Sequence, residues 1–210
     1  MSTTAFILGN GESRNGIKIA DLKSHGTVWA CNAVYRTEEP DFLVAVDPKM
    51  ILEIAETEYP KTHQVWSNWN QQYEKNPTAK THINYFRPSL GWSSGPTALK
   101  MSVEHKYIDI YILGFDYQGH AKEPGNANRG FGFNNVFKDS RNYKKSKDDA
   151  TYYGNWLNQT KQVIQKNPDV NFTRVIEKNA FKPHDLEFFK NFQNIEIDDF
   201  LKKFQLPPTK

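Results

Sequence analysis

Two glycines and several short polar side chains follow an apolar run near the start of the chain, in the order Gly9, Asn10, Gly11, Glu12 and Ser13. The glycines allow a tight turn and let a ligand approach the main chain, while Asn10 and Ser13 supply hydrogen-bonding groups of short reach. Such groups hold the ribose or phosphate of a nucleotide where a strand ends. Turn preferences alone explain the same residues as an ordinary tight turn.

Short apolar strands must position these groups. The predicted strands and the polar residues at their ends are 5–8 with Asn10, 27–32 with Asn32, and 42–46 with Asp47. Because ligands bind outside the carboxyl ends of parallel strands, this pattern predicts a site at one sheet edge. For Asp47 the alternative is a helix cap, since Pro48 opens a helix predicted over 49–57.

A second anion-binding signal lies in the middle of the chain. Ser93, Ser94 and Gly95 precede Pro96 and a helix predicted over 97–106, whose free amides and positive end favour an anion. A further strand is predicted over 109–114. It ends in Phe115, Asp116 and Tyr117.

From 118 to 142 no periodicity is visible, which is typical of a lid or binding loop. We therefore expect a mobile lid over 118–147. His120 opens it, and Tyr143, Lys144 and Lys145 in its basic far end could close over phosphates. The alternative for this basic run is a solvated face.

Length and composition fit one domain over 1–206, followed by a loose tail over 207–210. The chain has 210 residues, a formal net charge of +3 and one cysteine, Cys31. It contains no long apolar segment and no signal-peptide pattern, so the expectation is a soluble, cytoplasmic protein without a membrane span, in the host cytoplasm if it is viral. A further helix is predicted from Asp148 to about Lys166, then a strand over 169–176 and a helix over 184–192.

Five motifs together resemble the bacterial sialyltransferases of glycosyltransferase family 42 over roughly the first 120 residues. They are Gly9-Asn10-Gly11-Glu12-Ser13, Cys31-Asn32, Val46-Asp47-Pro48, Ser93-Ser94-Gly95 and Leu113-Gly114-Phe115-Asp116-Tyr117. The resemblance implies a single Rossmann-like α/β domain of the GT-A-like sialyltransferase variant, with a mostly parallel central sheet and a lid. It also implies a nucleotide-sugar substrate, with no metal and no cofactor.

Carried across residue by residue, the resemblance implies that Asn10, Ser13, Asn32 and Ser94 contact the donor. With them we group Gly9, Gly11, Ser93 and Gly95 as donor-binding residues. Tyr117 or Gln118 falls near a tyrosine that stabilises the departing phosphate. The family's catalytic histidine is missing, because no histidine lies between His120 and His184. For the base that deprotonates the acceptor we favour Asp47, then His120, with Asp116 as a further candidate.

The predicted activity is transfer of a sugar from a CMP- or UDP-sugar to an acceptor hydroxyl, independent of metal. The acceptor is either a glycan or DNA; basic charge favours a hydroxymethylated base of bacteriophage DNA. Two alternatives stay open. One is a pterin-type pyrophosphokinase that uses ATP and magnesium, which a similar Gly9-Asn10-Gly11 turn suggests, and the other is a non-catalytic nucleotide-binding module. Since the family often forms tetramers, a homo-oligomer is also open.

Overall fold

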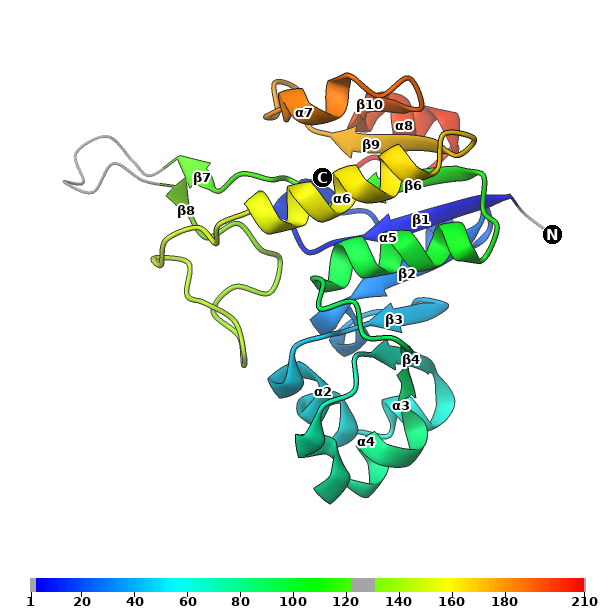
Figure 1. Cartoon of the computed structure of the whole chain (residues 1–210). Helices are drawn as coiled ribbons and strands as arrows, with labels where there is room; N and C mark the ends of the chain where they lie inside the picture. Colours follow the sequence, from blue (N-terminus) through cyan, green and yellow to red (C-terminus); the bar gives the residue numbers. More distant parts are fainter. Residues whose placement is uncertain (1–2, 122–130, 210) are drawn as a thin grey trace.

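The computed structural model describes residues 3–121 and 131–209, and its centre is an eight-stranded sheet in which all neighbouring strands are parallel (Figure 1). The strand order is β10-β9-β6-β1-β2-β3-β4-β5. The bounds are β1 Thr4–Leu8, β2 Thr27–Cys31, β3 Phe42–Val44, β4 Gln64–Ser67, β5 Asn84–Tyr85, β6 Asp109–Leu113, β9 Asn171–Ile176 and β10 Phe192–Glu196. The expected Rossmann-like α/β fold with a parallel sheet is thus confirmed.

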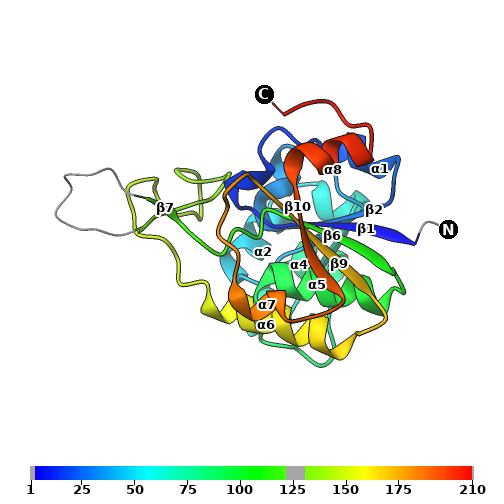
Figure 2. The ribbon, with the colours of Figure 1, turned by 90° about the horizontal axis from the view of Figure 1, so that it is seen from above.

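Helices cover both faces of the sheet, as Figure 2 shows from above. On one face lie α1 (Ile19–Lys23), α2 (Pro48–Ala55), α4 (Pro77–His82) and α8 (Ile197–Lys203), and on the other α5 (Ser94–Glu104), α6 (Gly154–Lys166) and α7 (His184–Glu187). Shorter turns of helix are α3 (Tyr59–Thr62), η1 (Glu12–Arg14), η2 (Asn32–Arg36) and η3 (Gln71–Lys75). Alternation along β1 supplies both cores, because Phe6 and Leu8 face one layer while Ala5 and Ile7 face the other.

The direction in which strands are added reverses at β1. From β1 the chain adds β2 to β5 in succession on one side, then returns through α5 to place β6 on the other side of β1. In β1, Leu8 is in register with Ala30 of β2 and with Leu113 of β6. The crevice outside β1 and β6 is therefore the topological switch point, where open α/β sheets bind ligands.

The start of α6 differs from the sequence prediction. The helix expected from Asp148 begins at Gly154 instead. The Asp148 carboxylate accepts a bond from the Lys145 amide at 2.7 Å, and its carbonyl accepts one from the Phe133 amide at 3.0 Å. Because these bonds tie Asp148 to Lys145 and to Phe133, the segment 148–153 stays outside the helix.

The structure corrects two further predictions, one near the C-terminus and one in the stretch without periodicity. The helix expected over 184–192 stops at Glu187, and an additional edge strand, β10, pairs with β9. Within the stretch without periodicity, β7 (His120–Ala121) and β8 (Phe131–Gly132) form an antiparallel pair.

Candidate functional site

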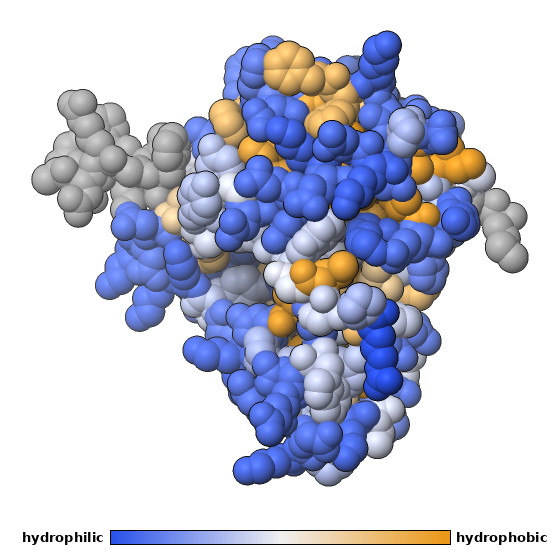
Figure 3. Space-filling model, in the orientation of Figure 1, coloured by the Kyte–Doolittle hydropathy of each residue, from blue (hydrophilic) through white to orange (hydrophobic). Residues whose placement is uncertain are grey.

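A pocket of about 170 Å³ opens at the switch point. Figure 3 shows a hollow in this face between the segment that follows β8 and the helices α5 and α6. Its walls come from six parts of the chain: Gly9, Asn10 and Gly11; Cys31 and Asn32; Ser93 to Pro96; Gly114 to Gly119; Phe133 to Asn135; and Ala150, Thr151, Tyr153 and Trp156. The ends of β1, β2 and β6 and the start of α5, which the sequence predicted as binding elements, therefore meet at this pocket.

Glycines let the turns after β1 and β6 touch. The Gly9 amide donates to the Leu113 carbonyl at 2.8 Å, and the Gly11 amide donates to that of Gly114 at 2.9 Å. A Cβ added at Gly9 would stand 2.6 Å from the Gly114 oxygen, too close for any side chain. Gly114 itself has a φ of +67°, which favours glycine. These glycines therefore bring the two turns together as well as exposing backbone to a ligand.

Asn10 is buried and its side chain is already engaged. Its Nδ2 donates to the Cys31 carbonyl at 3.2 Å and to the Tyr143 hydroxyl at 3.1 Å. Its Oδ1 accepts from Arg14 at 3.5 Å. The predicted donor-binding residue thus lines the pocket but also joins the turn to β2 and to Tyr143.

Asn32 and Ser94 form the part of the wall that offers hydrogen-bond donors to a ligand. Ser94 Oγ donates to Asn32 Oδ1 at 2.8 Å and accepts from the Val46 amide at 3.1 Å. Asn32 Nδ2 has no partner among the described residues, so it can donate two bonds to a ligand. Asn32 has a φ of +56°, a conformation that costs energy and clusters at functional sites.

The N-terminus of α5 adds backbone donors. The Ser93 amide is occupied by Gln159 Oε1 at 3.0 Å, but within 3–121 and 131–209 the Ser94 and Gly95 amides meet no acceptor. Pro96 has no amide hydrogen to satisfy. A Cβ added at Gly95 would lie 2.8 Å from the Phe115 ring, so glycine permits the close packing here. With the helix dipole, these two amides suit an anion.

Asp116 is the only charged side chain on the pocket wall in the described part of the chain. Its carboxylate accepts from the Ser13 hydroxyl, from the Ser13 amide at 3.2 Å and from Asn134 Nδ2 at 2.9 Å. Asp116 therefore ties the turn after β1 to the segment after β8, with one lone pair left on Oδ1. Ser13 is not itself among the lining residues.

Two buried arginines lie behind the turns. Arg14 Nε donates to the Gly9 carbonyl at 2.8 Å. Arg174, 2% exposed, donates to the carbonyls of Phe115 at 2.8 Å, Asp116 at 3.0 Å and Phe181 at 3.0 Å. Burial lowers the pKa of both guanidinium groups from the ordinary value, yet arginine stays charged in proteins. Arg14 also pairs with the Glu38 carboxylate at 3.7 Å, which offsets its charge. Neither arginine lines the pocket.

Tyr117 lines the pocket, but its hydroxyl points elsewhere. It donates to Thr160 Oγ1 of α6 at 2.8 Å in a buried bond. Burial raises the pKa of Tyr117 to about 12, so the phenol is neutral. The expected contact between this hydroxyl and a departing phosphate would require that bond to break.

Asp47, the favoured base, lies outside the pocket-lining set of the described residues. Its carboxylate caps α2 by accepting from the Lys49 amide at 2.8 Å. The capping alternative is thus the role that the structure displays. The side chain of His120 lies outside the part that the structure describes.

The predicted phosphate grip is placed beside the pocket and not on its wall. The Tyr143 hydroxyl accepts from Asn10 and from the Ala33 amide at 3.4 Å, and burial raises its pKa to about 12. Lys144 Nζ donates to the Asp149 carbonyl at 3.2 Å, and Lys145 is exposed. Of the predicted lid, residues 122–130 lie outside the described part.

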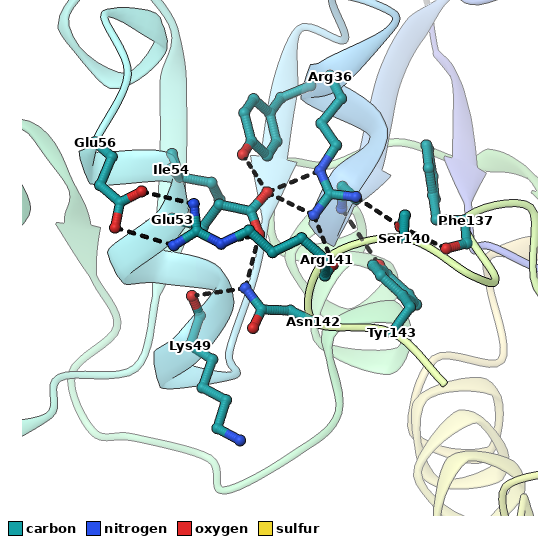
Figure 4. A network of polar contacts seen from close by, with 12 residues as sticks. Arg36, Lys49, Glu53, Ile54, Glu56, Phe137, Ser140, Arg141, Asn142 and Tyr143 are labelled. Carbon is teal, nitrogen blue, oxygen red and sulfur yellow. Dashed lines mark hydrogen bonds and ion pairs between the residues drawn. The ribbon is translucent and has the colours of Figure 1, made fainter. Parts of the chain in front are cut away.

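A network on α2 and η2 fastens the other end of that lid to the domain (Figure 4). Glu53 accepts from Tyr35 at 2.6 Å, Arg36 at 2.7 Å and Asn142 at 2.7 Å. Arg36 also donates to Ser140 Oγ and to the Arg141 carbonyl, each at 2.8 Å. We name these residues the Glu53 network. It fixes 140–143, and with them Tyr143, against the pocket floor.

Sequence reasoning named no residue of the outer wall of the pocket, although three residues of that wall fall in the stretch 118–147 that was predicted as a lid. Phe133, Asn134, Asn135, Thr151 and Trp156 line it, but none continues a strand or opens a predicted helix. The signal for Phe133, Asn134 and Asn135 was the aperiodic stretch 118–142 in which they lie, whereas Thr151 and Trp156 fall in the stretch predicted as a helix from Asp148.

The wall can thus bind a polar or anionic ligand through neutral donors. Among the described residues no cluster of histidine, cysteine and acidic side chains could hold a metal ion, and no helix there is apolar over enough length to cross a bilayer.

Compared with protein-family models and with curated proteins, the chain matches none.

Proposed function

We propose that the protein is a glycosyltransferase that binds a nucleotide-sugar in the pocket at the switch point and transfers the sugar to an acceptor hydroxyl. The observation that carries the proposal is the convergence of the Asn32 amide with the free Ser94 and Gly95 amides at the carboxyl edge of the sheet. The resemblance to family 42 sialyltransferases, whose motifs supply these residues, supports the same reading. We extend it to the donor class, a CMP- or UDP-sugar.

In this proposal the α5 amides take the phosphate next to the scissile bond, and Asn32 takes a ribose or phosphate oxygen. Positive charge on Arg174, behind the turn after β6, stabilises the phosphate as it leaves. For the base we now favour Asp116 over Asp47, because Asp116 lines the pocket and keeps one lone pair on Oδ1. The acceptor proton would pass to that oxygen.

The test is a thermal-shift series with CMP, UDP, GDP and ATP, with and without magnesium. A ligand that binds only the folded state raises the melting temperature by mass action. We expect a shift with CMP or UDP that persists in a chelator. A shift with ATP and magnesium alone would instead favour a pyrophosphokinase, and no shift with any nucleotide would contradict the proposal.

Asn32→Ala tests whether the Asn32 side chain binds the nucleotide. Loss of its one or two hydrogen bonds should weaken nucleotide binding roughly 2- to 10-fold, measured by titration calorimetry. Asn84→Ala is the control, because Asn84 is exposed on the edge strand β5, far from the pocket in strand order. Unchanged affinity in Asn32→Ala would remove Asn32 from the site.

A further inference from the structure

Aromatic side chains lead from the pocket to the outer surface at the start of α6. We call Tyr152, Tyr153, Trp156 and Phe181 the ring band. Tyr153 and Trp156 line the pocket, whereas Tyr152 is 75% exposed, Phe181 37% and Trp156 36%. A ring that is three quarters exposed cannot serve a ligand enclosed in the pocket, so the band suits a part of a substrate that projects outward.

Three rings of the band, Tyr152, Tyr153 and Phe181, contact one another. Tyr152 and Tyr153 stack with centroids 6.2 Å apart, and Phe181 meets the edge of Tyr153 at 6.0 Å. Tyr153 also contacts Tyr117, whose ring lines the pocket, at 6.5 Å. The band is therefore continuous from the pocket wall to solvent.

The chemistry of the band favours a planar ring over a sugar. A hydroxyl-rich glycan needs many directed hydrogen bonds, but besides the tyrosines the polar side chains of 150–156 are only Thr151 and Asn155. A nucleobase offers a π face that stacks on any aromatic ring without such bonds. A cluster of exposed rings at a pocket mouth is also unusual on a surface without a binding role.

Exposed lysines lie close to the band in sequence, beside the carboxylates of Asp148, Asp149 and Glu177. Lys147 lies three residues before Ala150 of the pocket rim, and Lys178 and Lys182 lie on either side of Phe181 in sequence. All three are exposed, and none has an acidic partner in the described residues. Cations beside stacking rings are the combination that grips a single nucleic-acid strand, because rings take the bases and lysines take the phosphates.

We propose that the ring band is a stacking subsite for a nucleobase of a single-stranded or flipped-out nucleic acid, which presents the acceptor hydroxyl to the pocket. This inference rests on the proposed function for the transfer step. It names the acceptor class, and it assigns Tyr153 and Trp156, the two rings of the band that line the pocket, to the part of the acceptor next to the pocket.

The test measures anisotropy of a short, fluorescein-labelled, mixed-sequence single-stranded DNA at low salt. We expect Trp156→Ala to weaken binding roughly tenfold or more, and Trp156→Phe, which keeps a ring, to retain most of the affinity. Trp69→Ala is the control, because Trp69 is 43% exposed but lies after β4, outside the pocket wall. A perfectly paired duplex should bind more weakly than the single strand.

Each other outcome overturns the inference in a recognisable way. Equal oligonucleotide affinity of wild type and Trp156→Ala would remove the stacking role. Loss of the CMP or UDP thermal shift in that variant, with oligonucleotide binding intact, would assign the rings to the base of the donor. Weakened binding of maltohexaose, with oligonucleotide binding intact, would indicate a glycan acceptor. Failure of the proposed function is separate, since it shows as the absence of any nucleotide shift in the wild type.

Discussion

At the scale of single residues, the buried charges behind the pocket decide its shape. Arg174 satisfies three backbone carbonyls at the turn after β6 and near Phe181, and its guanidinium lies 5.2 Å from the centre of the Tyr117 ring. No apolar side chain can replace those donors. The turn that carries Asp116 and Tyr117 therefore depends on a residue 57 or more positions later in the sequence, on β9.

Arg174→Met should destabilise the fold by about 3 kcal/mol or more, because it leaves three buried carbonyl oxygens unpaired. Urea denaturation followed by circular dichroism measures this loss as a lower midpoint. Arg141→Met is the control: Arg141 is 60% exposed, and its ion pair with the exposed Glu56 should contribute little to stability because solvent screens it. Equal midpoints for Arg174→Met and wild type would show that the carbonyls find other donors.

Substitution of Asp116 and of Asp47 distinguishes a general base from a helix cap. Under the proposed function, Asp116→Asn should reduce release of free nucleotide from a CMP- or UDP-sugar in the presence of acceptor by about 10²–10⁴-fold, the usual contribution of a general base. Asp47→Asn should leave the rate nearly unchanged, since asparagine caps a helix about as well as aspartate. The thermal shift with nucleotide checks that Asp116→Asn still binds. A larger loss in Asp47→Asn than in Asp116→Asn would restore Asp47 as the base.

At the scale of elements, the Glu53 network holds the segment after β8 against α2 and η2. Burial alone would raise the pKa of Glu53, but hydrogen bonds from Tyr35, Arg36 and Asn142 outweigh it, so the pKa lies below the ordinary value of 4.5. Because the folded pKa is the lower one, the stabilisation is complete above the unfolded value and is lost as the pH falls through the folded value.

We therefore expect Glu53→Gln to destabilise the protein at neutral pH by about 1–3 kcal/mol, with the difference from wild type shrinking below about pH 4.5. Thermal melts between neutral pH and about pH 3.5 test this. Glu56→Gln serves as control, since Glu56 is 55% exposed. A difference that is constant across this range would show that the charge of Glu53 does not contribute.

The elements also explain which predictions from sequence succeed. The turns at Gly9–Gly11 and Gly114 were predictable because an apolar run ending in glycine is a local signal. The late start of α6 was not, because Asp148 and Asp149 look like a helix start until the Phe133 amide, 15 residues earlier, bonds to the Asp148 carbonyl. Asn32 shows the same limit: its polarity was visible, but its left-handed conformation and its bond to Ser94 depend on tertiary contacts.

At the scale of the whole molecule, the pocket joins parts of the chain that the sheet alone does not connect. The turns after β1, β2 and β6 form a rigid floor, while the segment 133–149 supplies Phe133, Asn134 and Asn135 at one end and leads into Ala150 and Thr151 at the other. Several bonds link this segment to the first turn: the Val136 amide donates to the Asn10 carbonyl at 2.8 Å, the Glu12 amide donates to Asn134 Oδ1 at 2.8 Å, and Lys138 pairs with Glu12 at 2.6 Å. Ligand binding should therefore stabilise floor and segment together.

Hydrogen exchange read by mass spectrometry tests this coupling with CMP or UDP as ligand. We expect peptides covering 133–149 and the turn at 9–14 to exchange more slowly in the presence of nucleotide, because local opening of either would break ligand contacts. Peptides covering α4 and β5 are the internal control, since none of their residues lines the pocket. Slowing only at 9–14 would show that the segment is independent of the site, whereas equal slowing throughout would indicate global stabilisation. Asn134→Ala, which removes the bonds to Asp116 and to the Glu12 amide, should weaken the effect on 133–149 and keep the effect on the turn.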